Sequence, residues 1–94
     1  MSVNGLTITN VSVYPVSNSQ GRLRAVVRLV LNDSIQLTNL RIYAGSNGLF
    51  VSYPVESYDE GADFRQIFYP TSKEFREYVE NAILKEYEAI GGEA

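Results

Sequence analysis

The chain has 94 residues and a formal net charge of −3, and it contains neither cysteine nor histidine. Its length fits one small domain. The missing cysteine excludes a disulfide framework and a thiolate nucleophile, and the missing histidine removes the commonest general base and metal ligand. No apolar run approaches the ~20 residues of a membrane-spanning helix. Residues 1–5 lack the basic region of a signal peptide, so we expect a cytoplasmic protein.

The first two expected strands cover residues 6–16 and 22–32, joined by a turn over residues 17–21. In the second strand, two sets of residues alternate, which is the period of a strand with one buried face. The first set is apolar and consists of Leu23, Ala25, Val27, Leu29 and Leu31. The second set consists of Arg22, Arg24, Val26, Arg28 and Val30.

A third strand is expected over residues 35–43, after a tight hairpin turn at residues 32–33. The apolar residues of this strand change phase halfway along, between Leu37 and Leu40. A slip of that kind predicts a bulge or a bend near residues 38–39.

Two shorter strands follow. A turn at residues 46–48, where glycine permits positive φ angles, leads into a strand over residues 49–53. Pro54 ends that strand because proline donates no N–H to a ladder. Residues 54–63 are expected to form an exposed loop, and residues 64–69 a fifth strand.

The last third of the chain predicts one amphipathic helix over residues 72–90. Thr71 is the expected N-cap, Glu74 completes a capping box, and Gly91 and Gly92 stop the helix. The apolar stripe consists of Phe75, Val79, Ala82, Ile83, Tyr87 and Ile90. The predicted fold class is therefore α+β, with an antiparallel sheet of about five strands packed on one helix.

The basic residues are unevenly distributed. The first 41 residues hold four of the eight basic residues and only one of the eleven acidic ones, so an acidic protein can carry a basic face. Strand alternation places Arg22, Arg24 and Arg28 on one face over roughly 20 Å, and guanidinium groups suit phosphate oxygens. These three arginines are candidates for nucleic-acid contacts. The alternative is a solvated sheet face with cross-strand ion pairs.

Four further cations are candidates for the same interface, each with a structural alternative. Arg41 and Arg65 lie on other strands and extend the patch, although Arg65 can instead pair with a carboxylate of the preceding loop, such as Glu56. Lys73 and Arg76 lie on the first turns of the helix, where pairing with glutamates four residues away is the alternative.

Aromatic side chains offer a second kind of contact, because the bases of single-stranded nucleic acid stack on them. Tyr43, Tyr53, Tyr58 and Tyr69 are the candidates. The alternative for each is a buried ring with its hydroxyl at the rim. Phe50 is expected in the core.

The acidic residues of the chain do not indicate catalysis. Asp59, Glu60 and Asp63 cluster in one loop but lack the spacing of a calcium-binding loop, so we expect that loop to be solvated. Without histidine or cysteine, a hydrolase would need paired carboxylates in a cleft, and no pattern indicates one. We therefore expect no cofactor, no metal and no enzymatic activity.

Two stretches of the sequence are more distinctive than a simple pattern of strands and turns would require. One runs from Gly45 to Pro54 and follows the pattern G-x-N-G-L-F-V-x-x-P, and the other runs from Phe64 to Pro70 and follows F-R-x-I-x-x-P. In order and spacing they resemble the septation-regulator family of stage V sporulation protein G. The resemblance extends over residues 6–90.

The resemblance implies a small bacterial cytosolic dimer with an antiparallel sheet and a C-terminal helix. It further implies a role in septation, sporulation or gene regulation, with binding to DNA or RNA.

The chain departs from this family at three places. Many members have a basic pair after the proline that ends the G-L-F-V strand, whereas this chain has Val55, Glu56 and Ser57. Gln66 and Tyr69 stand where aspartate and histidine are common. The first departure weakens the case for phosphate contacts at that segment.

Two functions follow from these observations. The first is a dimeric regulator that contacts nucleic acid through its arginine-lined sheet face, mainly at phosphates. The alternative is a protein–protein adaptor in cell division or gene regulation, which the acidic balance and residues 55–57 favour. A dimer is expected because Val26, Val30 and the sheet edges need cover.

Overall fold

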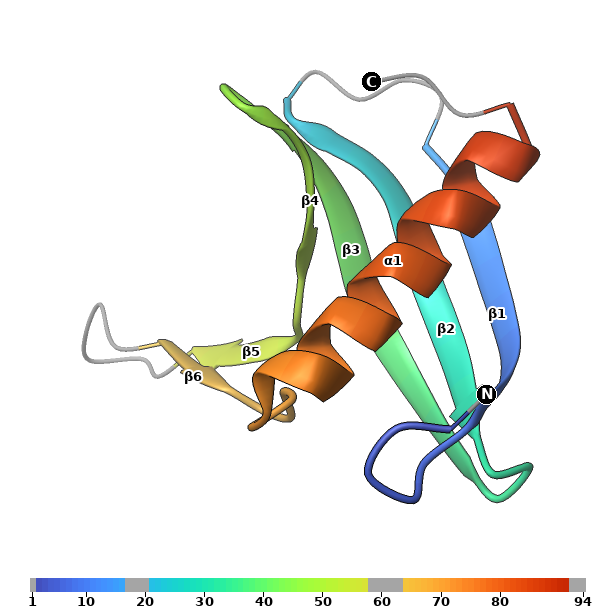
Figure 1. Cartoon of the computed structure of the whole chain (residues 1–94). Coiled ribbons are helices and arrows are strands. Elements are labelled where there is room, and N and C mark those ends of the chain that lie inside the picture. Colours follow the sequence, from blue (N-terminus) through green and yellow to red (C-terminus); the bar gives the residue numbers. More distant parts are fainter. Residues whose placement is uncertain (1, 17–20, 58–63, 92–94) are drawn as a thin grey trace.

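The computed structural model describes residues 2–16, 21–57 and 64–91, with the backbone alone at residues 57, 64 and 65. It contains a four-stranded antiparallel sheet in the order β1-β2-β3-β4, a separate two-stranded ribbon of β5 and β6, and one helix (Figure 1). The elements are β1 (Ile8–Pro15), β2 (Leu23–Leu31), β3 (Ile35–Gly45), β4 (Gly48–Ser52), β5 (Val55–Ser57), β6 (Phe64–Gln66) and α1 (Lys73–Ala89). The predicted α+β class is confirmed.

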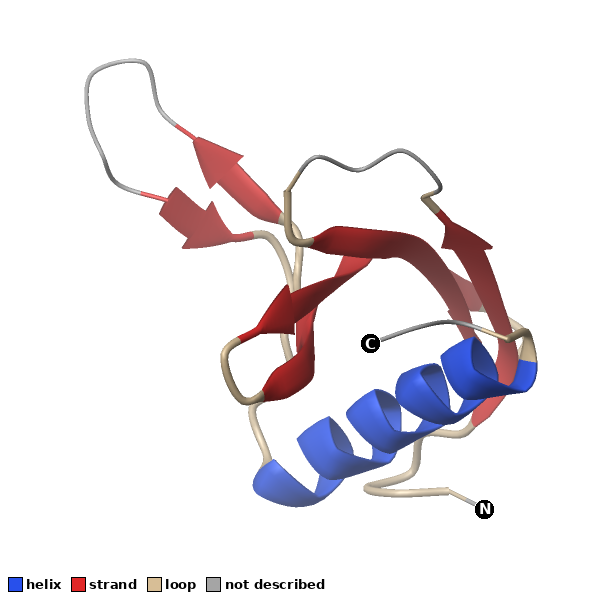
Figure 2. Ribbon diagram, turned by 90° about the horizontal axis from the view of Figure 1, so that it is seen from above, coloured by secondary structure: helices blue, strands red, loops and turns tan. Residues whose placement is uncertain are grey.

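The helix covers one face of the four-stranded sheet. Seen from above, the sheet curves over α1, which lies on its concave side, and the ribbon projects away from both (Figure 2). We call the concave face the inner face and the opposite one the outer face. Within the described part of the chain, α1 is neither long nor apolar enough to cross a lipid bilayer.

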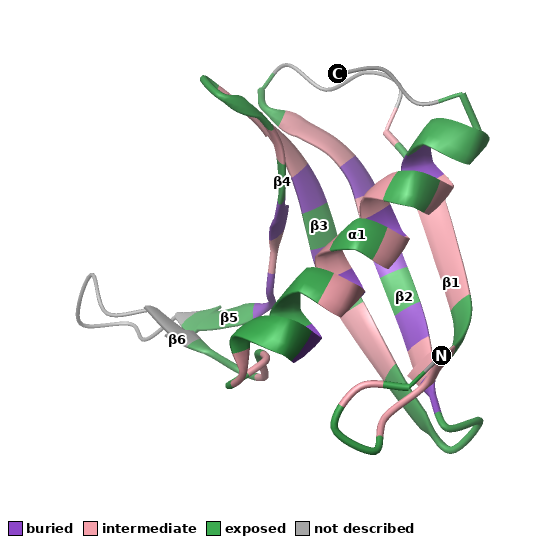
Figure 3. Cartoon of the chain, in the orientation of Figure 1, coloured by how far each residue is buried: buried purple, intermediate pink, exposed green. Residues whose placement is uncertain are grey.

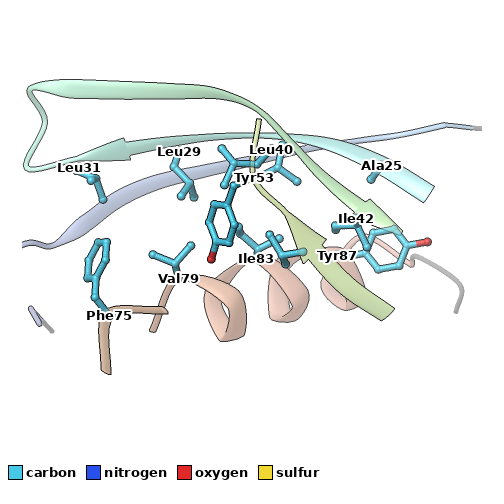
Figure 4. Packing of buried hydrophobic residues seen from close by; sticks show 12 residues of the cluster. Ala25, Leu29, Leu31, Leu40, Ile42, Tyr53, Phe75, Val79, Ile83 and Tyr87 are labelled. Carbon is cyan, nitrogen blue, oxygen red and sulfur yellow. The ribbon is translucent and has the colours of Figure 1, made fainter. Parts of the chain in front are cut away.

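β2 is a central strand, and its alternation is the one predicted. Its apolar phase is buried on the inner face from Ala25 to Leu31, whereas Arg28 of the other phase is exposed. Across the interior, the sheet residues face a stripe on α1, where Val79 and Ile83 are fully enclosed (Figure 4). The helix is correspondingly buried toward the sheet and exposed on its other side (Figure 3).

Most of the apolar stripe predicted for α1 is buried as expected, but its last residue is exposed. Phe75, Val79, Ile83 and Tyr87 are buried. Ile90 remains 44% exposed because it is the C-cap residue, after the last helical turn.

Two backbone features of the β2–β3 hairpin were predicted from the sequence and are confirmed. Asn32 and Asp33 have φ angles of 52° and 50°, as a two-residue type I′ turn requires. The β2–β3 register shifts by one residue between Leu37 and Leu40, and Asn39 in this stretch has a φ of 64°. This bulge lets β3 direct both leucines toward the core despite their different phases.

The segment after Pro54 differs from the prediction. Residues 55–57, expected in a loop, form β5 and pair with β6, which is shorter than the predicted 64–69. The buried Pro54 separates β4 from β5, and its carbonyl accepts a 2.8 Å hydrogen bond from the Ile67 N–H. The chain therefore leaves the main sheet at this proline and forms a separate ribbon.

The helix begins at a different cap from the one expected. Ser72, not Thr71, is the N-cap, and its Oγ accepts a 3.1 Å hydrogen bond from the Phe75 N–H. The same oxygen accepts a 2.7 Å bond from Nδ2 of Asn4, which ties the N-terminal segment to the start of the helix. At the other end, Gly91 has a φ of 86°, as predicted for a helix stop.

Replacing Ser72 with alanine should lower the free energy of unfolding by about 1 kcal/mol, because the first turn of α1 loses its side-chain acceptor. The matched replacement Thr71→Ala should change it by less than about 0.5 kcal/mol. Urea denaturation of the three proteins measures both values. Equal decreases in the two variants would contradict the assignment of the cap.

Candidate nucleic-acid interface

The outer face of the sheet belongs to the most basic part of the fold. The four strands β1 to β4 contain three arginines and no aspartate or glutamate. Helix α1 contains three cations and five glutamates, so its formal charge is 3 − 5 = −2, against +3 for the four strands. The negative net charge of the protein therefore does not extend to the sheet.

Arg28 lies on the outer face of the central strand β2. It is exposed and stands opposite Ser12 of β1 in the ladder. Its guanidinium lies 5.5 Å from the centre of the Tyr14 ring, a cation–π contact that holds the side chain over β1. Tyr14 is itself half exposed, so the pair presents a cation and an aromatic ring together.

Arg41 brings a second exposed cation to this face from β3. It stands opposite Val26 of β2, which places it diagonally across the ladder from Arg28. Its Nη1 donates a 3.4 Å hydrogen bond to the Tyr43 hydroxyl. The two arginines on neighbouring strands therefore form the centre of the candidate interface.

Arg22 and Arg24 have different surroundings. Arg22 is exposed, and together with residues 45–50 it lines an open hollow of about 360 Å³ at the tip of the β3–β4 hairpin. Arg24 instead donates a 3.0 Å hydrogen bond from its Nη1 to the carbonyl of Gly21, just before β2. Of the three arginines predicted on this strand, Arg22 and Arg28 are therefore the exposed ones, whereas Arg24 is partly buried.

The remaining predicted cations are not brought to the outer face. Lys73 and Arg76 belong to α1, on the other side of the sheet, and Arg76 pairs with Glu80 at 3.5 Å as expected from its helical spacing. Arg65 lies in β6, where the ladder sets its backbone opposite Glu56. That register agrees with the structural alternative for Arg65, although its side chain lies outside what the structure describes.

Phe50 corrects the prediction that this residue belongs to the core. Its side chain is 47% exposed, and the neighbouring Val51 occupies the buried position. Phe50 stacks on Tyr43 across the β3–β4 ladder, with ring centroids 5.7 Å apart and an interplanar angle of 23°. The signal for its position was the strand period, because Phe50 shares its phase with the polar Ser52.

The other tyrosine candidates have separate positions. Tyr53 is buried between β4 and α1, whereas Tyr69 is half exposed in the segment before the helix. Tyr58 and the acidic residues 59, 60 and 63 lie outside the described residues. Within the described residues, no group of three acidic side chains converges as a metal site would require.

Tyr53 belongs to a structural cluster on the inner side. Its hydroxyl donates a 2.9 Å hydrogen bond to Oε2 of Glu80, and the guanidinium of Arg76 lies 5.3 Å from the centre of its ring. Burial, reinforced by this bond to a carboxylate, raises the pKa of Tyr53 well above its ordinary value of 10.0. The cluster fastens β4 to the helix and does not open toward the outer face.

These features define a small α+β domain with a helix on one side of its sheet and an arginine-and-aromatic face on the other. The SpoVG family model matches residues 6–89 of the chain. The chain therefore belongs to the SpoVG family.

Several curated relatives are similar over most of this chain, although their own lengths differ. A protein of Caldicellulosiruptor saccharolyticus named "Putative septation protein SpoVG" is 31% identical over 85 residues, which cover 90% of this chain and 94% of the relative. A protein of the same name from Shouchella clausii is 34% identical over 86 residues, covering 92% and 86%. Another from Symbiobacterium thermophilum is 35% identical over 85 residues, covering 90% of this chain and 59% of the relative.

The raised pKa of Tyr53 predicts a loss of stability at high pH. As the pH rises through about 10, the unfolded chain loses this proton before the folded protein does, so unfolding becomes more favourable. The contribution of Tyr53 is fully present below that pH and is lost as the pH approaches the folded pKa. Urea denaturation at pH values between about 8 and 11 should show a smaller fall in Tyr53→Phe than in the wild type. Identical falls would contradict this prediction.

Proposed function

We propose that this protein binds DNA or RNA through the outer face of its sheet and acts as a regulator in septation, the process named in its relatives. The observation that supports the proposal is the exposure of Arg22, Arg28 and Arg41 on or beside strands that contain no carboxylate. Binding of this kind is dominated by phosphate contacts and is weakly sequence-specific. In this proposal the protein acts in the cytoplasm as a binding protein, without a catalytic step.

The acidic helix does not oppose such binding strongly. A helix with its side chains is about 10–12 Å across, and the Debye length is about 8 Å at physiological ionic strength. The exposed glutamates on the far side of α1 are therefore largely screened from a phosphate on the outer face. Local charge, more than the net charge of −3, governs the interaction.

The departure at residues 55–57 gives the sheet face a larger part in binding. Many members of the family have a basic pair at this place. In this chain the residues form β5 instead, and Glu56 is exposed. Phosphate contacts at that segment are disfavoured, so the proposal assigns them to the arginines of β2 and β3.

Reversing the charge of Arg28 tests the proposal. Arg28→Glu should weaken binding to short DNA and RNA, and the slope of log affinity against log salt should become shallower by about 0.9 for each duplex phosphate that the variant no longer binds. The triple variant that adds Arg22→Glu and Arg41→Glu should bind little at any salt concentration. Fluorescence anisotropy against single-stranded DNA, duplex DNA and RNA measures these effects.

The matched control for Arg28→Glu is Lys85→Glu. It makes the same change of charge on α1, away from the outer face, and should leave affinity and slope nearly unchanged. Equal weakening by both variants would mean that net charge, rather than this surface, governs binding. Unchanged binding in the triple variant would exclude the outer face.

We also propose that the protein forms a homodimer through the ribbon. Val55 and Ile67 are 48% and 63% exposed and line one hollow at its base, together with Arg41 and Tyr43 of β3. Val26 and Val30, expected to need cover, are already half-buried by their neighbours in the sheet. The proposal therefore assigns a second copy to the ribbon, at the edge of the arginine face, rather than to Val26 and Val30.

Light scattering at micromolar concentration should show a dimer for the wild type and a monomer for Ile67→Glu. The matched control Ile35→Glu changes an equally apolar residue, 50% exposed at the β2–β3 hairpin, and should stay dimeric. A monomeric wild type would contradict the dimer. It would favour the adaptor function, with a protein partner on the ribbon.

A further inference from the structure

Phe50 is a surface ring held in one position. Tyr43 stacks beside it at 5.7 Å between ring centroids, and Gly45 leaves room for it, because a Cβ at that position would lie 3.0 Å from the Phe50 ring. A ring fixed in this way loses little conformational entropy when a ligand stacks on it. The position is therefore pre-organised for a flat partner.

The surroundings of Phe50 combine an aromatic ring with positive charge. The hollow of about 360 Å³ at the tip of the β3–β4 hairpin is lined by Phe50, by Arg22 and by the hairpin residues 45–49. On the other side of the stack, Arg41 bonds to the Tyr43 hydroxyl. The ring pair thus has a cation on each side.

We infer that this hollow binds single-stranded nucleic acid by stacking a base on Phe50 while Arg22 contacts an adjacent phosphate; the inference rests on the proposed function. A nucleotide joins one planar base to one negative phosphate, which matches the ring and the cation of this hollow. Stacking on aromatic rings is how proteins bind single strands with little sequence preference.

The same geometry disfavours other occupants. In a duplex the bases are stacked on one another, and bringing one to Phe50 requires unstacking it at a cost of a few kcal/mol. Arginine and aromatic residues also occur at protein–protein interfaces, but a protein partner does not bring the repeated pairing of a flat base with a phosphate that a nucleic-acid strand has. The single strand satisfies both the ring and the arginines.

Replacing Phe50 with leucine keeps the apolar bulk and removes the ring. We expect Phe50→Leu to lower affinity for a single-stranded DNA 12-mer by about 5-fold to 100-fold. Affinity for the corresponding duplex should change by less than twofold, and the salt slope should be unchanged because the variant keeps every arginine that binds a phosphate. The matched control is Tyr69→Leu, which removes a ring of similar exposure from the segment before α1 and should leave binding unchanged.

Because the chain contains no tryptophan, one introduced tryptophan gives a direct fluorescence readout of binding. The variant Phe50→Trp places a single indole in the stack, and its fluorescence should fall when the DNA strand is added. An abasic strand of the same length, which offers phosphates without bases, should bind more weakly and leave the fluorescence unchanged.

The outcomes separate this inference from the proposed function. If Phe50→Leu binds the single strand like the wild type and the abasic strand binds equally well, base stacking is overturned. Loss of binding in the arginine variants would in that case still uphold the proposed function. If the wild type binds none of these nucleic acids at low salt, the proposed function fails and the inference fails with it.

Discussion

The packing of α1 against the inner face of β2 and β3 is the contact on which the rest of the structure depends. Leu29, Leu40 and Ile42 from the sheet and Ile83 from the helix are fully buried. Burial of each such side chain contributes about 1.5–3 kcal/mol, and a chain of this length has few of them. The inner face is therefore committed to the core, and polar or charged residues of the strands must face the other way.

That commitment separates the charges of the protein into two layers. Because strand residues alternate between faces, burying Val27 and Leu29 turns Arg28 outward. Because the helix buries its apolar stripe, its glutamates lie on the side away from the sheet or at its margins. An acidic chain thereby acquires a basic surface, which its net charge alone would not indicate.

The hollow at Phe50 depends on contacts between distant parts of the chain. The carbonyl of Arg22 accepts a 2.8 Å hydrogen bond from the Ala44 N–H, and this bond fixes the start of β2 beside the end of β3. The two-residue turn that follows then brings Phe50 back over Tyr43. The arginine and the ring, 28 positions apart in the sequence, become neighbours through the β2–β3 and β3–β4 ladders.

Local patterns in the sequence determined the α+β class, the buried phase of β2, the tight turn at Asn32 and the bulge near Asn39, because each depends on residues close together in the chain. The tertiary structure alone decided the stacking of Phe50 on Tyr43, the formation of the ribbon after Pro54 and the choice of Ser72 as the helix cap. Each of these depends on a distant partner: Tyr43 for the ring, β6 for the ribbon and Asn4 for the cap. The period of a single strand does not specify such long-range contacts, so only the folded chain shows which arginines share a surface with an aromatic ring.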